Sequence, residues 1–552
     1  MFSFLWRESR RIIFWTLITG ICSGLCSAAL IAIINKALSK QSDHELLLLQ
    51  FIILCVATLL TEMLCFYLTN RLSEATIYKL RIQICQLILK CPYPNLQKLG
   101  QAKLLANLTA DISTISHAFM LLPDICINTA IVLGCMVYLA WLSWQIALVL
   151  SGVILFCIVS YRLLAKLPEK TMQAAREEYD ILNQAFRNLT EGIKELKLHS
   201  NRKDAFMNQS LVASAENNRR LALSSATTYM LANKYTFLVY YLTIGLILFA
   251  LPKYNANQEV VSGYILVLLY MVGHLAALTN ALPAYVGARI ALEKVNKLGD
   301  FLQKQIASNK IKESNVLESF HSLTLHNITH SYHREKENNN FTLGPISLEF
   351  KPGELIFLIG GNGSGKTTLA MLLIGLYQPE QGEIKLNGIT ITEVNREAYL
   401  QNFSVVFSDF YLFDELFGFD SDKITNKVID YIERLHLHHK ITLTNGKFST
   451  INLSQGQRKR LALLIAYLED RPFYVFDEWA ADQDPEFKEI FYTELLPELV
   501  AKGKTVLAIT HDDRYFYLAD CCIKLEEGQI KAIELPHTNR QNKPFTETKE
   551  AF

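Results

Sequence analysis

Glycine, lysine and threonine residues near position 360 have the spacing of a phosphate-binding loop. The stretch Phe357–Thr368 reads FLIGGNGSGKTT, which fits the pattern G-x-x-x-x-G-K-[ST]. Glycines let backbone N–H groups point toward one centre, and a helix over 366–376 directs its positive end there. We expect Lys366 to reach the β- and γ-phosphates and the Thr367 hydroxyl to hold Mg²⁺. The predicted nucleotide-binding residues of the loop are Gly360, Asn362, Gly363, Ser364, Gly365, Lys366, Thr367 and Thr368.

Two carboxylates end an apolar segment further along the chain. The run Pro472–Glu478 reads PFYVFDE, which is typical of a buried strand with acidic residues at its carboxyl end. We expect Asp477 to bind Mg²⁺ through water and Glu478 to polarise the attacking water as a general base. A strand followed by two acidic residues is a weak signal alone, and the upstream phosphate-binding loop makes it specific.

The elements that must position these residues have the pattern of an α/β domain. After about residue 320 the chain alternates between short strands and helices, with 355–359 as the strand before the loop. Residues 323–332 are a predicted strand that precedes a polar hairpin at 333–340. Tyr332, at the end of that strand, is placed to stack on adenine.

The first 300 residues have the composition of a membrane protein. Half of the 552 residues are apolar and 19% are charged, with a mean hydropathy of +0.17. A helix needs about 20 apolar residues to cross a bilayer core. Six segments satisfy this requirement, at 12–35, 46–69, 122–141, 144–165, 235–252 and 260–283.

Charge indicates how these segments are oriented. The long polar connections 70–121 and 166–234 are rich in lysine and arginine, whereas the short connections carry few. The positive-inside rule places the N-terminus and both long connections in the cytoplasm. We expect both to extend the helices and to turn through short helices, near 92–100 and 192–202, that touch the nucleotide-binding half.

Other features of the composition narrow the function. The net charge of +1 gives no global field that favours nucleic acid. The cysteines form no metal pattern, a disulfide framework is not expected, and no cleavable signal peptide is evident. Glu62, Asp124 and His274 are ionisable residues in or near the spans, where cargo contact and helix–helix hydrogen bonding are equally good explanations.

A third motif makes a family resemblance specific. The run Leu453–Gln457 reads LSQGQ and opens a helix predicted over 457–469; it is similar to the LSGGQ signature of ATP-binding cassette (ABC) proteins, with Gln455 replacing a glycine. The other motifs occur in that family's order. The resemblance implies that Asp484 occupies the D-loop position, His511 contacts the γ-phosphate, and Tyr332 is the aromatic of the A-loop. It also implies that each ATP lies between the loop of one subunit and Ser454, Gln455, Gly456 and Gln457 of another.

The sequence departs from the family at two positions near the carboxylates. Ser408, a candidate Mg²⁺ ligand, stands where a glutamine normally contacts that ion; serine is too short to make the same contact directly, so we expect Asp409 or a water to substitute. Trp479 replaces a small residue after Glu478. The runs VFSDFYLFDE, LSQGQRKR, DEWAADQDP and Leu189–Leu198 resemble the bacterial exporters of cyclic peptides and peptide siderophores.

The resemblance implies an exporter half-transporter with two kinds of domain. The predicted organisation is an α-helical membrane domain at 1–300, a linker at 301–320, an α/β P-loop nucleotide-binding domain at 321–535 and a flexible tail at 536–552. The expected activity is ATP- and Mg²⁺-dependent export of a cyclic or modified peptide across the bacterial inner membrane by a homodimer embedded in lipid. The alternatives are a lipid or multidrug flippase, a siderophore importer on an exporter-like fold, an ATP-gated channel or receptor, and a heterodimer with a related chain.

Overall fold

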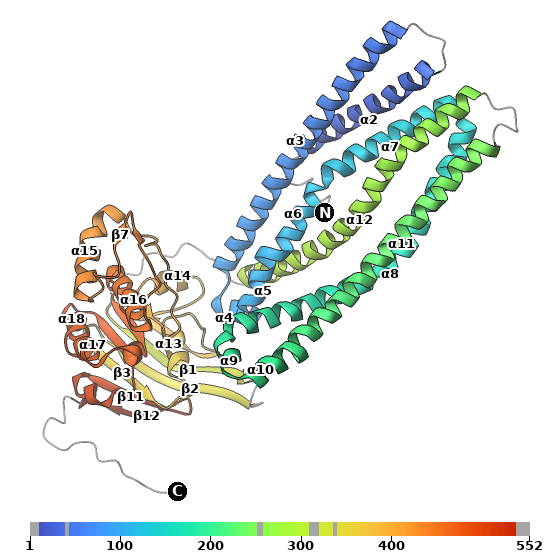
Figure 1. The fold of residues 1–552 in the computed structure, drawn as a ribbon. Coiled ribbons are helices and arrows are strands. Elements are labelled where there is room, and N and C mark those ends of the chain that lie inside the picture. The colour runs from blue at the N-terminus through green and yellow to red at the C-terminus, as the bar shows by residue number, and fades with distance from the viewer. Residues whose placement is uncertain (1–9, 39–43, 251–257, 308–319, 335–338, 537–552) are drawn as a thin grey trace. The chain divides into compact units, whose positions relative to one another are not determined.

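The computed structural model describes residues 10–38, 44–250, 258–307, 320–334 and 339–536 (Figure 1). The chain divides into two compact units. One unit comprises residues 1–86 and 102–299, and the other comprises residues 87–101 and 300–552.

The first unit is helical. Its elements are α2 (Arg10–Leu38), α3 (His44–Lys90), α5 (Gln101–Ala106), α6 (Ile112–Met120), α7 (Leu122–Leu142), α8 (Trp144–Glu191), α9 (Ile193–Leu198), α10 (Ser200–Ala205), α11 (Val212–Ala250) and α12 (Gln258–Ala307), with single π-helical turns at Asn107–Asp111 and Phe206–Leu211. Six spans within the described residues are long and apolar enough to cross a membrane. The six predicted membrane segments are therefore confirmed as helices.

The long helices of this unit pack in pairs. Helices α8 and α11 run side by side, and α2 lies against α7 (Figure 1). A Cβ atom on Gly134 of α7 would lie 2.6 Å from the Gly24 carbonyl oxygen of α2, so the glycine permits this close approach.

The predicted linker is wrong at its beginning. Helix α12 continues to Ala307, so the first residues of the predicted linker 301–320 are helical. The sequence around 301–307 keeps apolar residues at helical spacing, and Leu302 is fully buried. Positions 308–319 lie outside the described residues, as does the predicted tail from residue 537 onward.

The second unit is an α/β domain with a buried parallel sheet. Its strands are β1 (Leu323–Arg334), β2 (Asn339–Phe350), β3 (Leu355–Gly360), β4 (Gln381–Leu386), β5 (Ile389–Thr390), β6 (Phe403–Val406), β7 (Leu443–Thr444), β8 (Lys447–Phe448), β9 (Phe473–Asp477), β10 (Thr505–Ile509), β11 (Cys521–Glu526) and β12 (Gln529–Glu534). The larger sheet has the order β12-β11-β3-β10-β9-β6, and β11, β3, β10, β9 and β6 are parallel to one another. A second sheet has the order β2-β1-β4-β5, and β7 pairs with β8.

Two hydrophobic clusters cover this sheet, and the same unit contains several helices. The helices are α4 (Tyr93–Leu99), α13 (Lys366–Leu373), α14 (Arg396–Leu400), α15 (Ser421–Arg434), α16 (Gln455–Glu469), α17 (Pro485–Ile490) and α18 (Leu496–Ala501). Side chains alternate along β3: Leu355 and Phe357 belong to one cluster, and Ile356 and Leu358 to the other. Both faces of the sheet are therefore buried, as is typical of parallel strands.

The helix after the phosphate-binding loop is shorter than predicted. It ends at Leu373 rather than 376, because Gly375 adopts the left-handed conformation and its N–H donates to the Leu372 carbonyl. The signature helix α16 begins two residues before the predicted start at 457, because Ser454 caps it.

Short helix α4 lies against the α/β domain within the second unit. Gly100, with φ of 77°, ends α4. The Tyr377 hydroxyl donates to the Gln97 side chain at 2.7 Å, and the rings of Tyr93 and Tyr377 are stacked. The prediction of a short helix near 92–100 that touches the nucleotide-binding half is confirmed.

Candidate nucleotide site

The predicted nucleotide-binding residues gather at one edge of the large sheet. The phosphate-binding loop follows β3, Ser408 follows β6, and Asp477 ends β9. His511 comes shortly after β10, which lies between β3 and β9. Parallel strands present their carboxyl ends at the same edge, which is where α/β proteins bind ligands.

The conformation of Gly365 and the side chain of Lys366 define the loop after β3. Gly365 has φ of 100°, and a Cβ atom there would lie 2.7 Å from the Leu343 side chain, so no other residue type fits without a shift. The Lys366 ammonium group donates to the carbonyl oxygens of Gly360 at 2.9 Å and Gly361 at 3.0 Å. The buried hydroxyl oxygen of Ser364 has no hydrogen-bond partner within the described part of the chain.

Asp477 lies at the centre of this edge and is almost fully buried. One of its carboxylate oxygens accepts from the hydroxyls of Thr367 at 3.2 Å and Ser408 at 3.3 Å. Its other oxygen, Oδ1, has no partner among the described atoms. Burial raises the pKa of Asp477, and the hydroxyls of Thr367 and Ser408 oppose that shift.

These oxygens fit a hard divalent cation. Mg²⁺ takes carboxylate, hydroxyl and water oxygens, and protein sites commonly supply only part of its shell. A free carboxylate oxygen and two hydroxyls beside the phosphate-binding loop meet that requirement. Burial lowers the pKa of Lys366, while Glu478 and Asp477 raise it.

Glu478 follows Asp477 in a constrained backbone conformation. Its φ is 49°, in the left-handed region that few side chains favour. Its N–H donates to the Ile509 carbonyl of β10 at 3.1 Å, and its carboxylate lies 3.4 Å from the Nε2 atom of His511. The predicted base and the predicted γ-phosphate contact are therefore adjacent.

Lys459 of helix α16 fixes the Glu478 backbone. Its ammonium group donates to the Glu478 carbonyl at 2.7 Å and pairs with the Asp482 carboxylate at 2.8 Å. The Lys459 side chain is only 3% exposed. The indole N–H of Trp479 donates to the Lys459 carbonyl at 2.8 Å.

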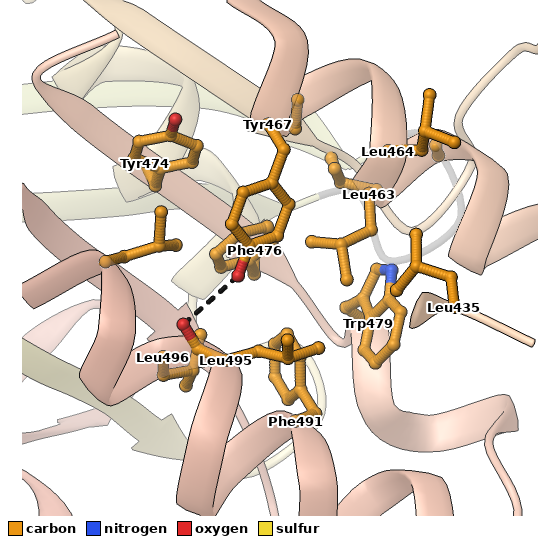
Figure 2. Close-up of a cluster of buried hydrophobic side chains, with 14 of the residues drawn as sticks. Leu435, Leu463, Leu464, Tyr467, Tyr474, Phe476, Trp479, Phe491, Leu495 and Leu496 are labelled. Atoms are coloured by element: carbon orange, nitrogen blue, oxygen red, sulfur yellow. Dashed lines mark hydrogen bonds between the residues drawn. The ribbon is translucent and has the colours of Figure 1, made fainter. Parts of the chain in front are cut away.

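The hydrophobic cluster beneath this loop explains why Trp479 replaces a small residue. Trp479 is buried beside Leu435, Leu463 and Phe491 (Figure 2). Its ring stacks on that of Phe491, with centroids 4.2 Å apart. The large side chain thus belongs to the core and does not point into the nucleotide site.

The signature segment is tied to the loop after Glu478. The Ser454 hydroxyl accepts from the Gln457 N–H, and the Gln457 side chain accepts from the Ser454 N–H, which forms a capping box. The Gly456 carbonyl accepts from the Gln483 side chain at 3.0 Å. Gln455 is exposed, so replacing the usual glycine at that position causes no clash.

Asp484 has two contacts of its own. Its carboxylate caps α17 by accepting from the Phe487 N–H at 2.9 Å, and it pairs with Arg460 of α16. The Phe487 N–H bond is the main cause of the lowered pKa of Asp484.

The geometry brings together most of the predicted residues. Lys366, Thr367, Ser408 and Asp477 share one edge with Glu478 and His511. Tyr332 is in β1, where its backbone pairs with Phe341, but its side chain lies outside the described structure. Asp409, which follows Ser408, is exposed.

Sequence reasoning missed Lys459, Arg460 and Gln483. The basic run after the signature looks like a solvated helix face. The signal that was available is spacing: Lys459 lies four residues before Leu463, a fully buried residue, so it is on the inner face of α16.

The ionisable residues of the membrane unit have separate environments. The His274 Nδ1 atom lies 2.7 Å from the Asn128 side-chain oxygen, which joins α12 to α7. Asp124 is exposed in the first turn of α7, and Glu62 is half-buried on α3.

Comparison with known proteins identifies the family. An ABC transporter model matches residues 343–481, and a model of the ABC transporter transmembrane region matches residues 11–278. The chain is 35% identical to the ATP-binding protein SyrD of Pseudomonas syringae pv. syringae over 95% of each chain. The chain therefore belongs to the ABC transporter family, with a membrane domain and a nucleotide-binding domain fused in one polypeptide.

Other relatives and a solved structure define the class more closely. The chain is 30% identical to the subtilin transport ATP-binding protein SpaT of Bacillus subtilis, over 43% of this chain and 41% of that one. It is 25% identical to an ATP-dependent lipid A-core flippase of Ralstonia nicotianae, over 84% and 80% of the two chains. A bacterial Atm1-family ABC exporter with ATP bound has the same fold, with a TM-score of 0.75, 18% identity and coverage of 97% and 96%. The protein is a multi-pass membrane ABC transporter with an exporter-type fold, and it binds ATP and couples ATP hydrolysis to transport.

Proposed function

We propose that this exporter moves a cyclic or otherwise modified peptide from the cytoplasm across the bacterial inner membrane. An antimicrobial peptide, a peptide siderophore or the precursor of one fits this cargo class. The motifs around Ser408, Ser454 and Glu478 that resemble cyclic-peptide exporters support this proposal. The relative named for subtilin transport supports it independently of those motifs.

The nucleotide site supports hydrolysis by a general base. Glu478 polarises the water that attacks the γ-phosphate, and His511 contacts that phosphate. Lys366 neutralises charge on the β- and γ-phosphates, and Tyr332 stacks on adenine. Asp477, Thr367 and Ser408 would hold Mg²⁺, which would supply further charge compensation. The observation that carries this assignment is the unpartnered, buried Oδ1 atom of Asp477 beside those hydroxyls.

The working unit is a C2 homodimer. A single chain supplies one phosphate-binding loop and one signature segment. Ser454 and Gly456 of each subunit complete the ATP site of the other, because this family places the two motifs of one cassette far apart. ATP binding draws the cassettes together and opens the cargo cavity outward, and hydrolysis resets the dimer.

Transport in inverted vesicles tests the cargo class. Vesicles that contain the wild type should accumulate a labelled cyclic peptide when ATP is added, and vesicles that contain Glu478→Gln should not. ATP-dependent movement of lipid alone, with no peptide accumulation, would overturn the proposal. That outcome would favour the second candidate, a lipid flippase, which the relatives named as lipid A-core flippases support.

A further inference from the structure

A cavity within the membrane unit has the chemistry of a binding site. Its volume is about 740 Å³, within the range of ligand pockets, and it lies among α8, α11 and α12. Aromatic side chains line part of it: Tyr161 of α8 and Phe237 and Tyr241 of α11. Glu62, Asp124 and His274 are not among its lining residues.

Hydrogen-bonded side chains join α11 and α12 at this cavity; we call Asn233, Thr279 and Asn280 the polar ladder. The Asn233 side-chain amide donates to the Asn280 side-chain oxygen at 2.9 Å. The Thr279 hydroxyl donates to the Asn233 side-chain oxygen at 3.1 Å. Pro283, which also lines the cavity, has no N–H to close a helical bond with the Thr279 carbonyl. The wall therefore offers both donors and acceptors, which peptide groups need.

Lys234 adds one positive charge to the lining of the cavity. It is exposed on α11, and no carboxylate lines the cavity or pairs with Lys234 in the part of the chain that the structure describes. An ammonium group next to a membrane span is costly unless an anion or water compensates it. The cavity is thus built to receive a negative group beside amide and aromatic partners.

Positions along two helices, α8 and α11, place the cavity at the same depth in the membrane. Lys234 precedes the apolar end of α11 at Ala250 by 16 residues, which is about 24 Å at 1.5 Å per residue. Tyr161 follows the start of α8 at Trp144 by 17 residues, which is about 26 Å. Both positions lie near one face of a hydrocarbon core that is about 30 Å thick. Charge asymmetry assigns this face to the cytoplasm, from which cargo enters.

We infer that this cavity is the cargo site and that Lys234 selects peptides that carry a carboxylate. The inference rests on the proposed peptide export and adds the chemical class of the cargo. The carboxylate pairs with Lys234, the peptide groups bond to Asn233 and Asn280, and apolar side chains pack on the aromatic wall. A lipid phosphate also fits the charge, but it does not use the donor and acceptor pairs of the ladder.

A pair of matched probes tests this inference on the full chain. The probes are a neutral-dye-labelled cyclic hexapeptide with one aspartate and its asparagine twin, and binding is followed by fluorescence anisotropy in phosphatidylcholine nanodiscs. Lys234→Ala should weaken binding of the aspartate peptide about tenfold to hundredfold and leave the asparagine twin within twofold. Lys234→Arg should restore binding. Lys170→Ala, which removes an exposed lysine of α8 that does not line the cavity, should change neither.

The other possible results distinguish carboxylate selection by Lys234 from lipid binding and from peptide export itself. Equal binding of both twins by the wild type and Lys234→Ala would overturn the inference. So would complete displacement of both twins from the wild type when phosphatidylglycerol replaces part of the phosphatidylcholine, because that result assigns the site to a lipid headgroup. If vesicles accumulate the peptides regardless of residue 234, the carboxylate selection fails and peptide export stands. If the wild type accumulates neither peptide, export itself fails.

Discussion

Lys459 is a buried ammonium group that contacts both the Glu478 carbonyl and the Asp482 carboxylate. It joins the signature helix to Glu478, whose backbone has a positive φ. A small displacement of a general base costs much of its effect, because proton transfer needs a close and oriented pair of atoms. Lys459 is therefore a positioning residue for the proposed base.

Replacing Lys459 should slow hydrolysis without preventing ATP binding. We expect Lys459→Met to lower kcat about tenfold to hundredfold and to leave KM for ATP within twofold. Steady-state ATPase kinetics of the full chain measure both. Lys427→Met is the matched control, because Lys427 is exposed on α15. Unchanged kcat in Lys459→Met would show that the bond to the Glu478 carbonyl does not position the base.

We expect the buried carboxylate of Asp477, which the proposed function requires, to lower the stability of the folded chain. Its raised pKa means that the carboxylate is less favourable in the folded chain than in the unfolded one. This cost is fully present at pH values above the folded pKa, shrinks as the pH falls through it, and is gone below the unfolded pKa of 3.8. Asp477→Asn should therefore raise the stability of the protein without ATP by about 1 kcal/mol, the order of an unsatisfied buried group.

Thermal unfolding with and without Mg-ATP checks this expectation. The Asp477→Asn variant should unfold at a higher temperature than the wild type in buffer alone, and it should gain less from Mg-ATP. A lower unfolding temperature in buffer alone would mean that Asp477 stabilises the fold through its hydroxyl partners.

Glu498 joins two helices of the nucleotide-binding domain. It lies on α18, accepts from Arg434 at the end of α15, and accepts from Lys502 at 2.7 Å. The bond from Arg434 is the main cause that lowers the pKa of Glu498 to about 2. The ionised pair therefore stabilises the fold above the unfolded pKa of 4.5, and that contribution is lost as the pH falls toward 2.

Neutralising Glu498 should have an effect that depends on pH. We expect Glu498→Gln to lower the free energy of unfolding by about 1 kcal/mol at pH 7, because the group is partly exposed and solvent screens it. The difference from the wild type should shrink as the pH falls below 4.5. Denaturant unfolding across this range measures it, with Glu489→Gln on α17 as an exposed control. A difference that is constant with pH would contradict the ion-pair explanation.

Periodic patterns predicted the elements better than their ends. The six apolar runs became helices, and PFYVFDE became β9 with Asp477 at its end. The ends of α12 and α13 were missed because burial of Leu302 and the conformation of Gly375 depend on packing that a local pattern does not contain. In the site, motif spacing predicted that Lys366, Asp477 and Glu478 lie together, but the contact between Lys459 and the Glu478 carbonyl depends on α16 lying against the loop after β9.

The proposed dimer predicts complementation between defective chains. A Lys366→Ala chain lacks a working loop, and a Ser454→Arg chain lacks a working signature. Each homodimer then has no intact ATP site. A heterodimer of the two has both defects in one site and keeps the other site intact.

Mixing the two variants should therefore restore activity. Equal co-expression should give roughly a quarter of wild-type ATPase activity, since about half the dimers are mixed and each has one of two sites. Separately expressed variants that are combined only after purification serve as the control. Activity that stays at the level of the separate variants would contradict an ATP site shared between subunits.

Trp479 can serve as an intrinsic fluorescent probe of the nucleotide-binding domain. The chain has five tryptophans, and Trp479 is the only one after Trp144. It is buried against Phe491 and bonded to the Lys459 carbonyl, one residue from Glu478. If the other four tryptophans are replaced by phenylalanine, the emission of the cassette comes from this indole alone. Stopped-flow fluorescence would then time the rearrangement of the Glu478 loop during each turnover, with no attached dye.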